Sequence, residues 1–424
     1  MILEQALISL TNFAISALLA RECSQHEYGS FVLAFSVLTF FGIFQSALVT
    51  GPMMVLGASL RGVDMQSYFR ATAYLQILLA LSLSLLVLAV LGIGVLCNLF
   101  GEGLRSTFVC LALVLPFVQG QEFFRRLLLT NMAVQRAMLT GVAWCALVVA
   151  GLFSLWTAGG GSWSSVAPGY LSANRALLCL GLASSVGCAV GYYFSKSFLA
   201  ARSFDLRQES RKNWNLGKWL IGTQVGGLGL YQANLWVVGA IGGETAVANL
   251  DAPRLLVAPI QVLIFGSANF LTPYVSARFA QGGTKAVKSI ISRIAPGWIL
   301  FFLASVVVVG LFGESLLSRV FGNKYTGATT ILWLWLSVYF AMALKQLPGI
   351  VLVAMRRTDI GMFIALSVGL FTMLLTFPLM MHGGEAWAIA ARLTGEIFLI
   401  IALVFFAWRM ISHANDLDLR KIMA

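Results

Sequence analysis

The chain has 424 residues, of which 59% are hydrophobic and only 10% are charged, and its formal net charge at pH 7 is +12. With a mean hydropathy of +0.88, it carries more apolar surface than so few charged side chains can cover in water. A lipid bilayer is itself an apolar solvent and requires no such covering. These values exclude a soluble globular protein and predict an all-α polytopic membrane protein.

Long apolar stretches predict about twelve transmembrane helices, each of roughly 17–25 residues, as a hydrocarbon core of about 30 Å requires. In chain order we expect them at residues 3–20, 29–50, 71–96, 106–123, 138–157, 176–195, 217–241, 255–274, 294–312, 328–354, 360–381 and 387–409. A long basic gap follows the sixth. We therefore expect an N-terminal six-helix lobe at 1–198, a cytoplasmic linker at 199–216, a C-terminal six-helix lobe at 217–411 and a cytoplasmic tail at 412–424.

Basic residues alternate between the gaps. About twenty of the 28 lie in every second gap, and about seven lie in the others. Positively charged loops stay on the cytoplasmic side, so both termini are expected in the cytoplasm. Topology and anionic lipid headgroups then explain most of the net charge, without nucleic acid. The predicted location is the inner (cytoplasmic) membrane of a bacterium, which the chain crosses many times.

One offset of 221 residues aligns two separate regions of the chain. Pro52 corresponds to Pro273, and each follows a Ser-Ala pair at the same distance. Arg136 corresponds to Arg357. Two halves with the same orientation form parallel repeats about an axis along the membrane normal. In transporters built this way the substrate path lies between the halves.

Sequence motifs for enzyme chemistry are missing. The histidines, His26, His382 and His413, lie in three different gaps, and no HExxH, GxSxG or P-loop pattern occurs. The largest predicted external gap, 157–175, contains no carboxylate. We therefore expect no enzymatic activity, no metal site and no cofactor. An acyltransferase or polymerase of polysaccharide assembly is a minor alternative.

Ionisable side chains inside apolar spans are costly and mark candidate functional sites. Lys345 lies in the tenth span beside Pro348, which interrupts helical hydrogen bonding. The alternative for Lys345 is a side chain that snorkels to the cytoplasmic interface. Arg392 and Glu396 are spaced i, i+4 on the twelfth span, so they share a face and either neutralise each other or line a pathway.

Arg254 and Asp251 open the eighth span and are close enough to pair. Most of the predicted spans have no carboxylate near the centre, where a pump for cationic drugs is expected to place one. The charge balance within the spans is therefore cationic or neutral, which favours an anionic cargo.

Amide and phenol side chains form a second group of candidates. They are Asn12 in the first span, Gln224, Tyr231, Gln232 and Asn234 in the seventh, and Asn269 in the eighth. Such groups suit a hydroxyl-rich or amphipathic cargo, or else hold helices together. Gly226 and Gly227 soften the seventh span, and with Pro348 they are the candidate hinge residues.

Three segments carry a family resemblance. Leu18-Leu19-Ala20-Arg21, followed by Glu27-Tyr28-Gly29, looks like an "ARxLxxxxYG" opening. Val320-Phe321-Gly322-Asn323-Lys324-Tyr325 is similar to an "lfG.xY..A..iL" signature, and Tyr231 with Ala252-Pro253-Arg254-Leu255 is similar to a segment joining spans seven and eight. Together they resemble the polysaccharide exporters of the multidrug/oligosaccharidyl-lipid/polysaccharide (MOP) flippase superfamily.

This resemblance implies a MATE-like architecture of two six-helix lobes and alternating access between cytoplasm and periplasm. The implied cargo is an oligosaccharide or polysaccharide precursor linked to polyprenyl diphosphate, with membrane lipids and polysaccharide-assembly proteins as further partners. In such relatives cationic cavity residues meet the diphosphate or acidic sugars, and Lys345, Arg392 and Arg254 are the positions here that match this role. A multidrug or organic-ion antiporter of the same superfamily is the alternative.

Overall fold

The computed structural model describes residues 2–57, 60–159, 171–201, 203–226, 230–354 and 358–413, and these residues are almost entirely helical, with no strand among them. The chain divides into two compact units, Met1–Gln232 and Ala233–Ala424. The predicted all-α class is thus confirmed. The predicted boundaries of lobes, linker and tail stay predictions, and the tail from residue 414 onward lies outside the described residues.

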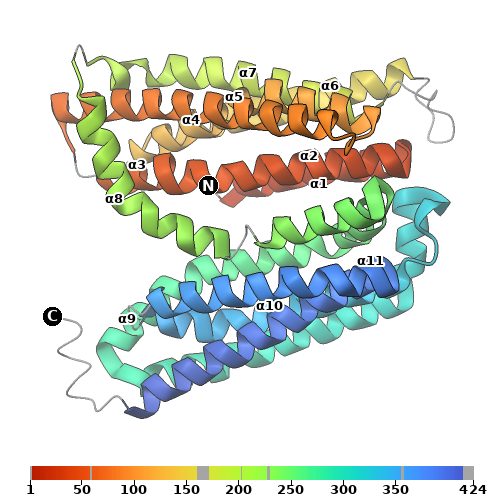
Figure 1. Cartoon of the computed structure of the whole chain (residues 1–424). Helices are drawn as coiled ribbons and strands as arrows, with labels where there is room; N and C mark the ends of the chain where they lie inside the picture. Colours follow the sequence, from red (N-terminus) through yellow and green to blue (C-terminus); the bar gives the residue numbers. More distant parts are fainter. Residues whose placement is uncertain are drawn as a thin grey trace. The chain divides into compact units, whose positions relative to one another are not determined.

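The first unit contains most of the separate helices (Figure 1). They are α1 (Ile2–Glu22), α2 (Gln25–Gln45), the π-helical η1 (Ser46–Thr50), α3 (Gly51–Leu56), α4 (Gly62–Leu96), α5 (Glu102–Thr130), α6 (Val134–Ala158), α7 (Ala173–Ser195), the short η3 (Lys196–Leu199) and α8 (Leu206–Gln224). Polar caps fix several helix starts, because a side-chain oxygen accepts a backbone N–H that has no partner within the helix. Ser24, Ser172 and Asp205 cap α2, α7 and α8 in this way.

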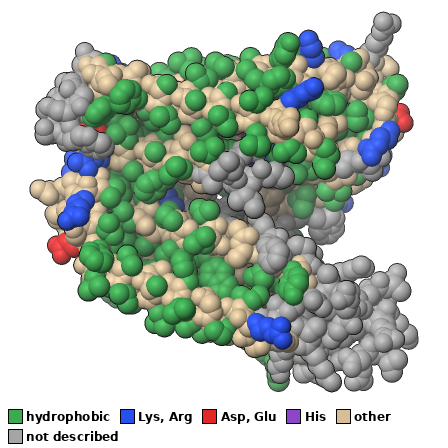
Figure 2. Space-filling model, turned by 180° about the vertical axis from the view of Figure 1, so that it is seen from behind, with side chains coloured by type: hydrophobic (Ala, Val, Ile, Leu, Met, Phe, Trp, Pro, Cys, Tyr) green, Lys and Arg blue, Asp and Glu red, His purple; other side chains and the backbone are tan. Residues whose placement is uncertain are grey.

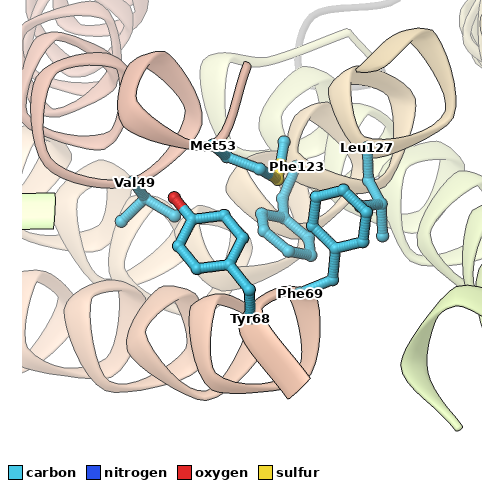
Figure 3. Close-up of a cluster of buried hydrophobic side chains, with 6 residues drawn as sticks. All are labelled: Val49, Met53, Tyr68, Phe69, Phe123 and Leu127. Carbon is cyan, nitrogen blue, oxygen red and sulfur yellow. The ribbon is translucent and has the colours of Figure 1, made fainter. Parts of the chain in front are cut away.

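Packing in the first unit centres on α5, which runs against α4 and α7, while α6 packs on α7 and α1. Figure 3 shows one of its buried apolar clusters, which joins the π-helical segment and α3 to α4 and α5 through Val49, Met53, Tyr68, Phe69, Phe123 and Leu127. The Tyr68 hydroxyl also donates a 2.7 Å hydrogen bond to Asn213 of α8. The segment around η1 is therefore held from three sides.

The rest of the chain forms α9 (Leu230–Phe321), the short η5 (Gly322–Tyr325), α10 (Thr329–Ala354) and α11 (Thr358–His413). A straight helix of the 92 residues of α9 would be about 138 Å long at 1.5 Å per residue. Instead the ribbon changes direction (Figure 1), and Gly243 has a left-handed φ of +71°. Gly384 interrupts α11 with φ 69° and ψ −155°, in the short gap predicted between the last two spans.

Nine helical segments of the described residues are long and apolar enough to cross a membrane. They are Gln25–Leu56, Gly62–Leu96, Glu102–Thr130, Val134–Ala158, Ala173–Leu199, Gln232–Ile264, Ser292–Tyr325, Thr329–Ile350 and Asp359–Arg409. The last contains two predicted spans, and the first predicted span, 3–20, corresponds to α1. Apolar side chains cover much of the face shown in Figure 2, with a few scattered basic and acidic groups. The chain is a polytopic membrane protein.

The predicted seventh span, 217–241, differs from the structure. Here α8 begins at Leu206, inside the predicted linker, and ends at Gln224, and α9 begins at Leu230. The turns before residue 217 pack within the first unit: Asn213 is 2% exposed and accepts the hydrogen bond from Tyr68. The polar N-terminal turns of α8 are thus part of a packed helix, which hydropathy alone does not detect.

Candidate functional site

Three charged side chains of the second unit, on α10 and α11, form a triad of ion pairs. Glu396 accepts a hydrogen bond from Lys345 at 2.7 Å through Oε2 and pairs with Arg392 at 2.6 Å through Oε1. The side chain of Glu396 is only 2% exposed, that of Arg392 10% and that of Lys345 19%. The predicted i, i+4 pairing of Arg392 with Glu396 is confirmed. Lys345 is ion-paired within the protein, and its position relative to the cytoplasmic interface stays a prediction.

A second charged pair lies on α9, where Arg254 donates to Asp251 at 2.7 Å, as the sequence predicted. Tyr339 of α10 connects it to the triad. Its buried hydroxyl hydrogen-bonds to Gln261 at 3.4 Å and interacts with the charges of Asp251, Arg254 and Arg392. We call Asp251, Arg254, Lys345, Arg392 and Glu396 the charge cluster. Three helices thus contribute charges to one neighbourhood.

The charge cluster contains three cations and two carboxylates, so its formal charge is +1. Removing charges from water costs several kcal/mol per ion, which a good ion pair only partly offsets. Charged groups in membrane helices are therefore candidates for a functional site.

The amides of the predicted seventh span fall in two places. Gln224, at the end of α8, donates to Ser46 of η1 at 3.3 Å within the first unit. Asn234, on α9 in the second unit, donates a buried 2.6 Å hydrogen bond to Thr376 of α11. Gln232 is buried as well. The side chains of Tyr231 and Asn269 lie outside the described residues, so the structure groups only part of this set.

The candidate hinge residues are also separated. Gly226 is buried in a short π-helical stretch that follows α8, and π-turns recur at functional sites. Pro348 lies inside α10, one turn from Lys345. Gly227 lies outside the described residues.

The first unit contains a cavity of about 220 Å³ whose lining combines polar side chains with a larger apolar surface. Its polar lining comes from Asn12, Thr39, Gln45, Gln119, Gln121 and Glu122, and Trp144 and apolar side chains complete it. We call it the amide cavity. Asn12 was predicted from the sequence, but the buried glutamines were missed, since Gln45 and Gln119 are 74 positions apart in the chain. Their common signal, an uncharged polar residue in an apolar helix, is too frequent to select them.

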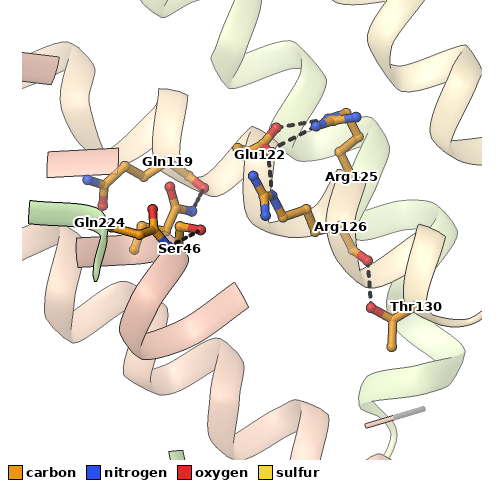
Figure 4. A network of polar contacts seen from close by, with 8 residues as sticks. Ser46, Gln119, Glu122, Arg125, Arg126, Thr130 and Gln224 are labelled. Atoms are coloured by element: carbon orange, nitrogen blue, oxygen red, sulfur yellow. Dashed lines mark hydrogen bonds and ion pairs between the residues drawn. The ribbon is translucent and has the colours of Figure 1, made fainter. Parts of the chain in front are cut away.

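Figure 4 shows the polar contacts near two residues of the lining, Gln119 and Glu122. Arg125 donates to both oxygens of Glu122, at 2.8 and 2.9 Å, and Arg126 donates to one of them at 2.6 Å. Gln45 donates to the backbone oxygen of Gln119 at 2.6 Å. Within the described residues no three His, Cys, Asp or Glu side chains are grouped to hold a metal ion.

Comparisons with known proteins identify the fold. No protein-family model and no curated protein matches the sequence. Among solved structures, an inward-facing multidrug resistance MATE family transporter of the MOP superfamily has a TM-score of 0.75 at 13% identity, with 98% of this chain and 96% of that one covered.

Two further structures are similar. The lipid II flippase MurJ in an inward closed conformation has a TM-score of 0.67 at 14% identity, covering 100% of this chain and 90% of that one. A MOP superfamily transporter from Pyrococcus furiosus, described by a binding pocket of reverse polarity that suggests a different function, has a TM-score of 0.62 at 13% identity, covering 96% and 93%. The chain therefore has the MATE-like fold of MOP-superfamily transporters over nearly its whole length.

Proposed function

We propose that this protein translocates a lipid-linked oligosaccharide or polysaccharide precursor, carried on polyprenyl diphosphate, across the bacterial inner membrane by alternating access. From the alternation of basic residues we infer that both termini lie in the cytoplasm, and we propose membrane lipids and polysaccharide-assembly proteins as further partners. One observation carries the proposal: Lys345 and Arg392 converge on Glu396 at 2.7 and 2.6 Å in a cluster with a positive charge in excess.

The geometry suits a diphosphate for two reasons. Guanidinium and ammonium groups form strong charge-assisted hydrogen bonds to phosphate oxygens, and arginine adds a planar fork of donors. The Glu396 carboxylate engages Lys345 and Arg392. An arriving diphosphate would replace this carboxylate as their partner, so the cations would exchange one anion for another instead of passing through an unpaired state.

The main alternative is export of a cationic drug, and three carboxylates argue against it. Glu122, Asp251 and Glu396 are each bonded to at least one arginine. None of the three offers an uncompensated negative charge to a cationic cargo. The Pyrococcus furiosus transporter supports the principle that this fold carries pockets of differing polarity.

The proposal is tested with the purified chain in proteoliposomes that contain a polyprenyl-diphosphate oligosaccharide in the inner leaflet. A membrane-impermeant glycosidase outside the vesicles then releases sugar only from translocated lipid. Since a hydrogen bond to a charged group contributes about 1.5–3 kcal/mol, Lys345→Gln and Arg392→Gln should each slow release about ten- to a hundredfold. Lys345→Arg keeps the charge and should retain most of the activity.

Lys212→Gln is the matched control, since Lys212 pairs with Glu209 on the surface of α8 and its side chain is 47% exposed. It should translocate like the wild type. Wild-type rates in Lys345→Gln and Arg392→Gln, with thermal unfolding unchanged, would overturn the role of the charge cluster. Uptake of an organic cation by the same vesicles, without release of sugar, would favour the antiporter.

A further inference from the structure

The amide cavity lies in the first unit, is built from different helices than the charge cluster, and is not used by the function proposed above. Asn12 comes from α1, Gln45 from α2, Gln119 and Gln121 from α5, and Trp144 from α6. Three of these four helices, α2, α5 and α6, are long and apolar enough to span a membrane. Polar groups that line a cavity in such helices are costly unless something hydrogen-bonds to them.

Gln119 is the member of the cavity with unused hydrogen-bonding capacity. The residue is 2% exposed and lines the cavity, and its amide nitrogen has no hydrogen-bond partner among the described residues. Its Oε1 accepts only a long 3.4 Å bond from Gln76, and the other oxygen of that pair, Gln76 Oε1, is also without a partner. The unpaired nitrogen is itself buried, so a rotation of the Gln119 side chain toward the cavity is what presents this donor to a ligand.

The chemistry of the remaining lining points to a neutral ligand. Both oxygens of Glu122 are already engaged by arginine, so the cavity presents no free carboxylate that would select a cation. Amides offer donors and acceptors together, which matches a hydroxyl group, itself both donor and acceptor. Several amides in one cavity therefore match a molecule with several hydroxyl groups.

Trp144 adds an apolar surface. Its indole N–H donates to Ser184 at 2.9 Å, so only the ring is available to the cavity. A pyranose combines hydroxyl groups around its edge with apolar C–H faces, and an aromatic ring beside amides fits both. The volume of about 220 Å³ is below the roughly 300 Å³ at which pockets for drug-sized ligands begin. This volume suits one sugar ring.

We propose that the amide cavity binds a single neutral pyranose ring, between the glutamine amides and the face of Trp144. Its meaning for transport rests on the proposed function, in which the ring belongs to the glycan of the cargo. The binding of the sugar does not depend on the proposed function, because it involves neither the diphosphate nor the charge cluster. The π-helical turn η1, which directly follows Gln45, is the type of local irregularity that recurs at ligand sites.

The experiment measures saturation transfer by NMR from the detergent-purified full chain to free methyl glucoside and free N-acetylglucosamine. Gln119→Leu keeps the side-chain size and removes one hydrogen bond, worth about 0.5–1.5 kcal/mol, so binding should weaken about two- to tenfold. Thr39→Trp fills the cavity from an exposed position of α2 and should abolish the signal. Gln208→Leu, at an exposed position of α8, should bind as the wild type does.

Three outcomes would overturn the proposal. The first is an absence of saturation transfer to both sugars, which would mean that the cavity holds only water. The others are equal saturation transfer in Thr39→Trp and the wild type, and displacement of the sugar by inorganic phosphate. Lys345→Gln separates the two proposals. It should lose translocation and keep sugar binding. If the charge-cluster variants translocate normally while Thr39→Trp loses sugar binding, the proposed function fails and the sugar site stands.

Discussion

The two units satisfy their buried polar groups in different ways. In the second unit, Asp251 pairs with Arg254 within α9, and Glu396 of α11 pairs with Arg392 of its own helix and with Lys345 of α10. In the first unit, the amide cavity is lined mainly by neutral side chains, and the amide nitrogen of Gln119 has no partner among the described residues. A buried charge must have a partner within the protein, whereas a buried amide tolerates a missing bond until a ligand supplies it.

The largest expected effect is in the charge cluster. Glu396→Gln leaves Lys345 and Arg392 as buried cations without their carboxylate, and breaking a buried ion pair in this way costs about 3–5 kcal/mol. We expect a clear drop in the thermal midpoint of the purified chain. Glu314→Gln, at an exposed position of α9, is the control and should unfold like the wild type. Equal midpoints for both variants would show that the cluster is hydrated and that the contrast between the units is wrong.

Glycine packing next to each site gives an intermediate effect. Gly395 precedes Glu396 on α11, and a Cβ added to it would lie 1.9 Å from Thr372 Oγ1. A Cβ added to Gly187 of α7 would lie 2.8 Å from Cγ of Gln121, which has the longer side chain. Overpacking costs typically about 1–3 kcal/mol, so Gly395→Ala should destabilise more than Gly187→Ala. Gly297→Ala, with nothing within 4 Å of the new Cβ, is the reference. The order of the three unfolding midpoints is the measurement, and a reversed order for the first two contradicts the prediction.

The smallest effect concerns single amide hydrogen bonds, one in each unit. Asn234→Leu removes the 2.6 Å bond to Thr376, and Gln45→Leu removes the 2.6 Å bond to the Gln119 carbonyl. Hydrogen bonds between membrane helices contribute about 0.6 kcal/mol on average, so both variants should lose similar, small amounts of unfolding free energy. A loss several times larger for Gln45→Leu would mean that the amide cavity needs all its amides to fold, which would weaken the case for a ligand.

Local spacing accounts for the parts of the site that the sequence predicted. The pairs Asp251–Arg254 and Arg392–Glu396 are three and four residues apart, and a helix brings such positions together whatever surrounds it. The bond from Lys345 to Glu396 connects positions 51 residues apart, and only the packing of α10 on α11 creates it. The glutamines of the amide cavity were missed for the same reason.

The sequence by itself determined that this is an all-α polytopic membrane protein, where most of its spans lie, and which charges within helices pair. Hydropathy and helical periodicity are properties of consecutive residues, so no tertiary contact is needed to deduce them. Only the tertiary structure decided that Glu396 serves two cations, that α8 packs on η1 from within the predicted linker, and that amides of separate helices enclose one cavity. These features depend on which helix faces meet, and that choice is made by packing between distant segments.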